Sequence, residues 1–156
     1  MRKSCIILSI TIAIIVLMCS FSVFALQDGQ VYIISLKGEI TPAMSAYVAD
    51  QIELANLSQA KGIILEITTL GGLVNSALEI RDSILSSDVH VAAYVASRAE
   101  SAGALITIAA DTIVMSPGSH IGSAEPIPYS EKAVAYVSGE FRTTAELRGR
   151  NPQIAA

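Results

Sequence analysis

Apolar runs rich in β-branched residues alternate with helical patterns along most of this 156-residue chain. Four such runs predict buried strands, at residues 31–36, 62–67, 89–95 and 112–115. Helices are predicted between them, starting at Thr41-Pro42 and spanning residues 74–84 and 101–110. Strands and helices that alternate at these lengths predict an α/β fold in which helices cover a mainly parallel sheet.

Each helical segment carries apolar residues at helical spacing, which predicts the face that packs on the sheet. These residues are Met44, Val48, Ile52 and Ala55 in the first helix, and Val74, Ala77, Ile80 and Ile84 in the second. A last helix is predicted over residues 132–148, with Val134, Val137, Phe141 and Ala145 as its apolar face. Because no strand follows that helix, we expect the domain to be incomplete at its C-terminal end.

The first 25 residues differ in character from the rest of the chain. Arg2 and Lys3 precede an apolar stretch of 21 residues, Cys5 to Ala25, and polar residues follow it. A cationic start, an apolar middle and a small residue before a polar boundary are typical of a secretory signal peptide. A retained membrane anchor is the alternative, since roughly 20 apolar residues span a bilayer. We therefore predict residues 1–25 as signal or anchor, residues 26–156 as one domain, and an exported protein.

Composition excludes several classes of protein. Hydrophobic residues make up 52% of the chain, which excludes a disordered protein. Ten Lys and Arg against 14 Asp and Glu give no basic surplus for binding nucleic acid. Both cysteines, Cys5 and Cys19, lie in the first segment, so the domain has no disulfide, thiolate metal site or cysteine nucleophile.

Three predicted strand-to-helix junctions carry unusual residues, at the sheet edge where ligands of parallel sheets bind. The first contains Gly71 and Gly72, whose N–H groups can point at an anion or simply form a tight turn. The second places Ser101 at the start of a helix among small residues. A serine there is either a nucleophile near backbone donors or a helix cap. The third, residues 116–126, is turn-rich and typical of a pocket mouth.

A serine nucleophile needs a base, and the domain offers few. His90 opens a strand at the far end from the junctions, whereas His120 lies in the third junction and is a conceivable base. Lysine is the other choice, because an amine in an apolar setting gives up its charge more easily. Lys61 precedes a strand at the wrong end, while Lys132 starts the last helix near the pocket mouth. A solvated charge is the alternative role for Lys132.

Four motifs occur in an order that resembles the NfeD membrane serine proteases, relatives of signal peptide peptidase A and of the Clp proteolytic subunit. They are Gly71-Gly72 after a strand, Ser101-Ala102-Gly103, the stretch from Pro117 to Ile127, and Gly149-Arg150-Asn151. The resemblance covers residues 31–151, nearly all of the predicted domain, and implies a ClpP/crotonase fold.

The resemblance implies an endopeptidase with a catalytic Ser-Lys dyad of Ser101 and Lys132, which needs no cofactor or metal. The backbone N–H groups of Gly72 and Ala102 would bind the oxyanion, and Gly71 would help to hold the peptide. Ala124 stands where the Clp subunit has its histidine base, which disfavours a Ser-His-Asp triad.

The same family implies a hydrophobic peptide or a stomatin-like membrane protein as substrate, a homodimer or higher homo-oligomer, and membrane association with the domain on the extracytoplasmic side. Family members usually have Asp-Thr-Pro-Gly-Gly at the first junction, where this chain has Thr-Thr-Leu-Gly-Gly at residues 68–72. The missing Asp and Pro predict a looser loop. The alternatives are a non-catalytic scaffold or binding module of the same fold, or an acyl-CoA enzyme of the crotonase branch.

Overall fold

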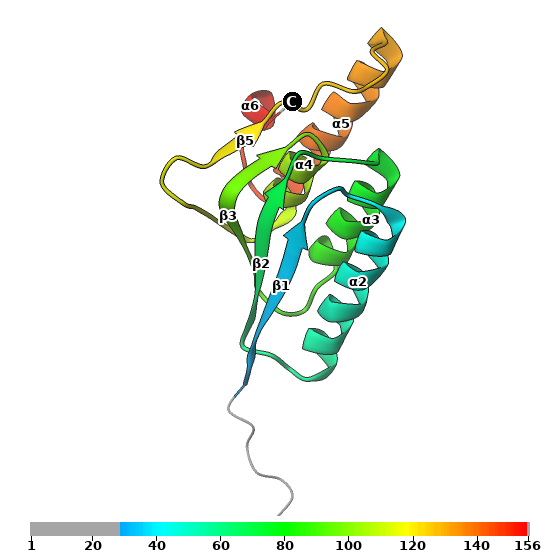
Figure 1. The fold of residues 1–156 in the computed structure, drawn as a ribbon. Helices are drawn as coiled ribbons and strands as arrows, with labels where there is room; N and C mark the ends of the chain where they lie inside the picture. The colour runs from blue at the N-terminus through cyan, green and yellow to red at the C-terminus, as the bar shows by residue number, and fades with distance from the viewer. Residues whose placement is uncertain (1–28, 156) are drawn as a thin grey trace, which may run out of the picture.

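Strands and helices alternate along the chain in the computed structural model, which describes residues 29–155 (Figure 1). The predicted signal or anchor, residues 1–25, lies outside the described residues and stays a prediction. Within residues 29–155, no helix is both long and apolar enough to cross a membrane. The elements in chain order are β1 (Val31–Lys37), α2 (Pro42–Leu57), β2 (Gly62–Thr69), α3 (Val74–Leu85), β3 (Val91–Glu100), α4 (Ala102–Ala109), β4 (Thr112–Met115), β5 (His120–Gly122), α5 (Glu131–Leu147) and α6 (Pro152–Ala155).

The strands form one parallel sheet in the order β1-β2-β3-β4, and the short β5 pairs with the end of β3. Val31 lies opposite Gly62, and Ile63 lies opposite Val91, which sets the register of the first three strands. Since all of these strands run in one direction, their carboxyl ends meet at one edge, the upper edge in Figure 1. The predicted α/β fold with a parallel sheet is confirmed.

Helices cover one face of the sheet (Figure 1). Alternate strand residues point to this face, because successive side chains of a strand point to opposite sides. The buried strand residues include Ile34, Leu36, Ile63, Leu65, Ile67, Val91, Ala93 and Val95. The helix residues buried with them are Val48, Ile52 and Ala55 of α2 and Ala77, Ile80 and Ile84 of α3. The apolar faces predicted for these two helices are therefore confirmed, with Met44 and Val74 only partly buried.

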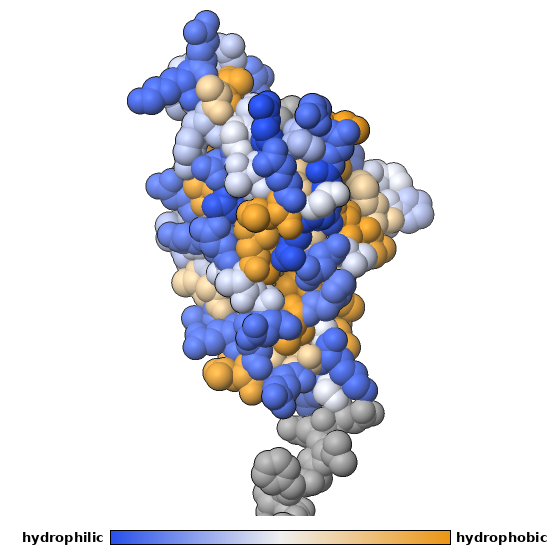
Figure 2. Space-filling view, turned by 180° about the vertical axis from the view of Figure 1, so that it is seen from behind, coloured by the Kyte–Doolittle hydropathy of each residue, from blue (hydrophilic) through white to orange (hydrophobic). Residues whose placement is uncertain are grey.

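The other face of the sheet is more open. Ile33 of β1 and Val114 of β4 are 70% and 48% exposed, and Lys37 pairs with Glu66 across β1 and β2 at 2.9 Å. Figure 2 shows the molecule from behind relative to Figure 1, with hydrophobic residues gathered in the middle of the view and hydrophilic ones around them. Apolar side chains therefore reach the surface in patches as well as filling the core.

Local signals set most element boundaries correctly. Thr41 caps α2, since its Oγ1 accepts a hydrogen bond from the Met44 N–H at 3.3 Å, and Pro42 is the first helical residue. The third predicted strand is the exception: β3 begins at Val91 and continues to Glu100, past the predicted end at residue 95. The additional residues pair with β5, a three-residue strand too short to show a pattern in the sequence.

Candidate active site

Thr69, the last residue of β2, holds the loop that follows it at Leu70–Gly72. This threonine is 2% exposed, and its Oγ1 donates to the Gly38 carbonyl oxygen at 2.6 Å. The same oxygen accepts the Gly71 N–H at 2.9 Å. Hydrogen bonds from a buried threonine thus hold the loop that lacks the family's Asp and Pro, while its being looser than the family's loop stays a prediction.

The Gly72 N–H group points away from Ile40, the residue that pairs with Gly72. Ile40 and Gly72 form a parallel bridge, in which the Ile40 N–H donates to Gly71 and the Leu73 N–H donates to Ile40, both at 2.9 Å. In a parallel bridge of this kind, the N–H of the central residue takes no part and points to the opposite side. The Gly72 N–H is therefore available to a ligand beside the loop.

Gly71 brings the loop into contact with Ser101. A Cβ atom at Gly71 would lie 3.1 Å from the Ser101 Oγ and 2.7 Å from its Cβ, and the second distance is closer than real Cβ atoms approach. Only glycine therefore fits between the loop and the serine. The first and second predicted junctions are brought together at this point, with the serine hydroxyl directly beside the loop backbone.

Ser101 has an unusual backbone conformation between β3 and α4. Its φ is 52° and its ψ is −119°, a strained combination for a residue other than glycine. The Ser101 N–H donates to the Gly122 carbonyl oxygen at 2.8 Å, which ties the turn to β5. Ser101 occupies the N-cap position of α4, but its side chain makes no capping hydrogen bond. A strained serine in a sharp strand-to-helix turn is the arrangement that exposes a nucleophile.

Helix α4 is buried along its whole length, from Ala102 to Ala109. Gly103 fits against Thr69, because a Cβ there would run into the Thr69 side chain. The N-terminus of α4 lies next to Ser101, so the helix dipole and the first N–H groups favour negative charge there. The Ala102 N–H is the first of these groups.

Two arginines hold the other end of α4. Arg150 donates to the carbonyl oxygens of Ile108 at 3.1 Å and Ala110 at 2.8 Å. Arg148 donates to the Ala109 carbonyl oxygen and to the Asp111 carboxylate, each at 2.5 Å. The last carbonyl groups of a buried helix have no partner within it, so these arginines supply the partners that water cannot.

The two arginines also affect each other. Burial lowers the pKa of the Arg150 guanidinium, Arg148 lowers it further, and Asp111 offsets part of this effect. The hydrogen bonds to the α4 carbonyl oxygens compensate for the lost hydration of these charges. The motif Gly149-Arg150-Asn151 thus fixes the helix that carries Ser101 at its other end, a role that sequence reasoning missed.

A third arginine joins α5 to α3. Arg81 of α3 hydrogen-bonds to Glu140 of α5 and to Asp82. Burial acts to lower the pKa of Arg81, but these hydrogen bonds outweigh it and leave the pKa above the usual range. The C-terminal half of α5 is therefore fixed to the body, while its first turns extend beyond the carboxyl ends of the strands (Figure 1).

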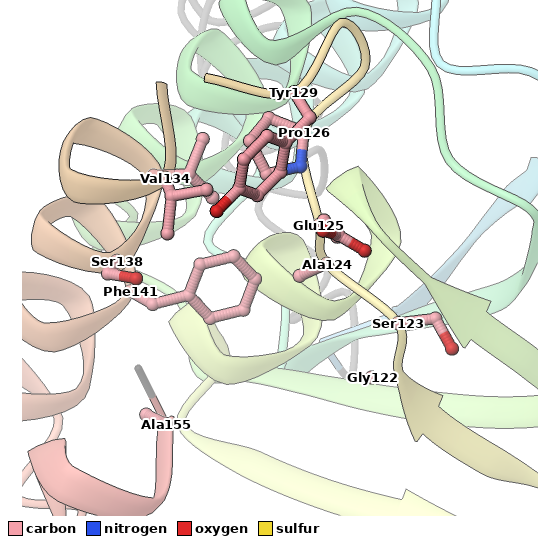
Figure 3. Close-up of a pocket in the computed structure, with 11 residues that line it drawn as sticks. Gly122, Ser123, Ala124, Glu125, Pro126, Tyr129, Val134, Ser138, Phe141 and Ala155 are labelled. Atoms are coloured by element: carbon pink, nitrogen blue, oxygen red, sulfur yellow. The ribbon is translucent and has the colours of Figure 1, made fainter. Parts of the chain in front are cut away.

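Apolar cavities and an open groove surround the serine and the loop. A small cavity of about 30 Å³ lies at Ser101, between α3, α4 and α5. A larger cavity of about 360 Å³ lies next to it, lined by residues 122–126 and by α5 (Figure 3). A groove of about 650 Å³ runs beside the loop and is lined by Thr69–Gly72, Gly38, Glu39, Thr68 and Arg98. The pocket mouth predicted at residues 116–126 corresponds in part to the wall of the second cavity.

The predicted bases lie at different places. Lys132 is the second residue of α5 and is exposed, and it does not line the cavity at Ser101. Its catalytic role stays a prediction. His120 bonds to the Glu100 carboxylate through Nε2 at 2.7 Å, and His90 bonds to Thr112 at 3.0 Å. Neither histidine is held toward Ser101.

No group of three or more His, Cys, Asp or Glu side chains that could hold a metal occurs among residues 29–155. The arrangement at the edge of the sheet suits acyl-transfer chemistry. It combines a strained serine, two backbone N–H groups beside it and apolar cavities for a substrate.

Comparisons with known proteins agree with this geometry. A family model described as NfeD1b, N-terminal domain, matches residues 30–156. The chain is 35% identical over 134 residues to the membrane protein NfeD1b of Bacillus subtilis, covering 83% of this chain and 31% of that protein. It is 33% identical over 147 residues to the membrane-bound protease PH1510 of Pyrococcus horikoshii, covering 83% of this chain and 32% of that protein. The chain thus spans about a third of the length of these relatives.

Solved structures show the same likeness. A serine-to-alanine mutant of the 1510-N membrane-bound stomatin-specific protease matches with a TM-score of 0.76 and 30% identity, over 81% of this chain and 68% of that one. A lysine-to-alanine mutant of that protease in complex with a substrate peptide has a TM-score of 0.74 and 31% identity, over 81% and 64% of the two chains. ClpP1 of Listeria monocytogenes shares the fold, with a TM-score of 0.66 and 22% identity over 79% and 75%. With its fold, its serine junction and the match over residues 30–156, the chain belongs to the NfeD1b N-terminal domain family.

Proposed function

We propose that this domain is a serine endopeptidase in which Ser101 is the nucleophile and Lys132 the general base. The observation that carries the proposal is the contact between Gly71 and Ser101, which sets a strained serine hydroxyl beside a loop with an unused N–H group at Gly72. Strain of this kind is retained where the surrounding structure enforces it, and it is concentrated at functional sites. The relatives named as proteases support the same activity.

In the proposed reaction, Ser101 Oγ attacks the carbonyl carbon of a peptide bond while neutral Lys132 accepts the hydroxyl proton. The N–H groups of Gly72 and Ala102 bind the negative oxygen of the tetrahedral intermediate. Lys132 then donates its proton to the departing amine, and the substrate carbonyl remains as an ester on Ser101. Attack by water, with Lys132 again as base, releases the acid and restores the serine.

Lys132 must reach Ser101 for this reaction, and two features support that. It follows Gly122 by ten residues, and the Gly122 carbonyl oxygen accepts the Ser101 N–H at 2.8 Å. The intervening segment also lines the cavity at Ser101 through Ala124 and Pro126. An apolar peptide bound against this segment would remove water from the lysine amine and favour its neutral form.

The groove beside the loop supports an extended peptide substrate. A peptide there would add hydrogen bonds to the Gly71-Gly72 backbone, as in recognition by strand addition. Leu70 at the rim is 67% exposed, which suits an apolar peptide. We propose a hydrophobic, membrane-derived segment as substrate, such as one from a stomatin-like protein. We further propose that the exported protein acts on the extracytoplasmic side, associated with the membrane, as a homodimer or higher homo-oligomer.

The alternative is a binding module that holds apolar peptides without cutting them. The exposed position of Lys132, away from the cavity at Ser101, favours it. The two functions differ in one measurable product, the cleaved peptide.

The deciding experiment is peptide cleavage by the full chain in detergent micelles, followed by mass spectrometry on a panel of apolar peptides. We expect cleavage by the wild type and a loss of at least about 100-fold in both Ser101→Ala and Lys132→Ala. Arg142→Ala, which removes an exposed cation from the same helix, serves as the control and should retain activity. Cleavage retained in Lys132→Ala would reject the dyad. Binding without cleavage by folded wild type would support the module instead.

A further inference from the structure

The short strand β5 contacts Ser101 and lies between the two residues of the proposed dyad along the chain. The carbonyl oxygen of Gly122, its last residue, accepts the Ser101 N–H at 2.8 Å, and Lys132 follows ten residues later. The segment that leaves β5 lines the cavity at Ser101 through Ala124 and Pro126. A displacement of β5 would therefore disturb both the backbone of Ser101 and the start of the segment that leads to Lys132.

The backbone of β5 offers few contacts to hold the strand in place. It has three residues, His120–Gly122, which pair with Arg98–Glu100 at the end of β3. The first two of these residues are exposed. A strand this short makes few backbone hydrogen bonds, so pairs of side chains across the two strands contribute a large share of its stability.

One side-chain hydrogen bond joins β5 to β3 directly before Ser101. His120 lies opposite Arg98 in the register, and Glu100, two residues after Arg98, has its side chain on the same face. The His120 Nε2 lies 2.7 Å from the Glu100 Oε1. Because a carboxylate only accepts hydrogen bonds, Nε2 carries the proton and donates it. The Arg98 guanidinium approaches the same carboxylate oxygen to 3.8 Å.

Glu100 borders both β5 and the loop after β2. Its side chain is 22% exposed and contacts β5 through His120, whose own side chain is 53% exposed. Its carbonyl oxygen lies at the loop, where a Cβ atom on Gly71 would be 3.2 Å away. The hydrogen bond between His120 and Glu100 thus joins β5 to the residue that precedes Ser101 and that also borders the loop.

We propose that His120 and Glu100 are a positioning pair, whose hydrogen bond holds β5 against the end of β3 and thereby fixes Ser101 for attack. This inference rests on the proposed peptidase activity. Neither side chain takes a proton in the proposed reaction. The pair acts through the hydrogen bond from the Ser101 N–H to Gly122, one of the contacts that enforce the strained backbone of Ser101. Without the pair, β5 is held less firmly and Ser101 relaxes toward an unstrained conformation.

The test measures how fast a fluorophosphonate probe modifies Ser101 in the full chain in detergent micelles. It also measures kcat and KM for the apolar peptide that the chain cuts fastest, with kcat normalised to the sites that the probe labels. We expect His120→Ala to lower the labelling rate and kcat about 10-fold, because a displacement of about 1 Å costs about 100-fold and this one is smaller. KM should stay within about 2-fold, since the effect is on the reacting serine and not on peptide binding.

Conservative and matched variants separate the hydrogen bond from general damage to the fold. His120→Gln keeps an N–H donor toward Glu100 and should restore both rates to within about 3-fold of the wild type. Glu100→Ala should be about as slow as His120→Ala, and the double variant no slower than either, because both changes remove the same hydrogen bond. His90→Ala removes another exposed histidine, bonded to Thr112 at 3.0 Å at the opposite edge of the sheet, and should leave both rates unchanged.

The outcomes separate this inference from the activity on which it rests. Labelling and kcat at the wild-type level in His120→Ala would overturn the inference and leave the peptidase standing. So would losses that multiply in the double variant, or a His120→Gln variant as slow as His120→Ala. No labelling of Ser101 and no cleavage by folded wild type would overturn the proposed peptidase, and this inference with it.

Discussion

Replacing Gly71 with alanine tests the close contact on which the site depends. Gly71 has a φ of +107°, and a Cβ there would lie 2.7 Å from the Ser101 Cβ and 3.2 Å from the Glu100 carbonyl oxygen. Two costs follow. A non-glycine residue in such a conformation costs about 1–3 kcal/mol, and overpacking a filled site costs about 1–3 kcal/mol more. We therefore expect Gly71→Ala to lower the free energy of unfolding by about 2–6 kcal/mol.

Gly118→Ala is the matched control for backbone strain. Gly118 also has a positive φ, +78°, but a Cβ there would meet no heavy atom within 4 Å. This variant carries the strain without the overlap, so we expect a loss of about 1–3 kcal/mol. Urea unfolding of both full-length variants, followed by circular dichroism, gives the two free energies. Equal losses would show that the loop does not press on Ser101 and would refute the reasoning.

The same variant should also affect the proposed reaction. To accept a Cβ at Gly71, either the loop or Ser101 has to move, and a displacement of about 1 Å costs about 100-fold in rate. We expect that loss in kcat/KM at temperatures where Gly71→Ala is folded, and none in Gly118→Ala. Unchanged cleavage by Gly71→Ala would contradict the role given to the loop.

Three further changes test other parts of the site through the free energy of unfolding in urea. Thr69→Val leaves the Gly71 N–H without its acceptor and should lower the free energy of unfolding by about 1–3 kcal/mol. Thr69→Ser keeps a hydroxyl and should lower it less. Equal losses would show that the Thr69 hydrogen bonds do not stabilise the loop. Arg150→Met removes partners of the last α4 carbonyl oxygens and should cost about 2–3 kcal/mol. Arg142→Met, at an exposed position, should lower the free energy of unfolding little. Similar losses for both arginines would show that the hydrogen bonds of Arg150 do not stabilise the end of α4. Ser101→Gly should be more stable than Ser101→Ala by about 1 kcal/mol, because glycine adopts the positive φ of this position without strain. If Ser101→Ala were the more stable variant, the backbone at Ser101 would not be strained.

The sheet and the helices over it were predictable because the apolar residues that they bury recur in the sequence at the spacing of strands and helices. The strand at residues 62–67 and the faces of α2 and α3 each follow from residues a few positions apart. The extension of β3 to Glu100 was not predictable. It depends on hydrogen bonds to β5, which lies 20 residues further along the chain at His120–Gly122.

The parts of the site likewise differ in whether they could be predicted from the sequence. Ser101 and the Gly71-Gly72 pair were identifiable, since glycine and a serine among small residues mark a junction where backbone and ligand approach closely. That the two junctions touch follows from the pairing of β2 with β3. The hold of Thr69 on the loop and the cavity at Ser101 between α3, α4 and α5 depend on contacts between distant segments, and no local pattern signals them. Arg148 and Arg150 gave one usable signal, two arginines two residues apart just after a helix, which suits the capping of carbonyl groups.

The sequence by itself determined the class of fold, the order of its elements and the identity of the nucleophile candidate, because each of these depends on residue type and local spacing. Tertiary structure alone decided which groups surround that serine. It placed the loop against Ser101, fixed α4 at both ends and left Lys132 exposed on the first turn of α5. Distances between segments far apart in the chain come from the packing of the whole sheet and its helices, and that packing is a property of all the residues together.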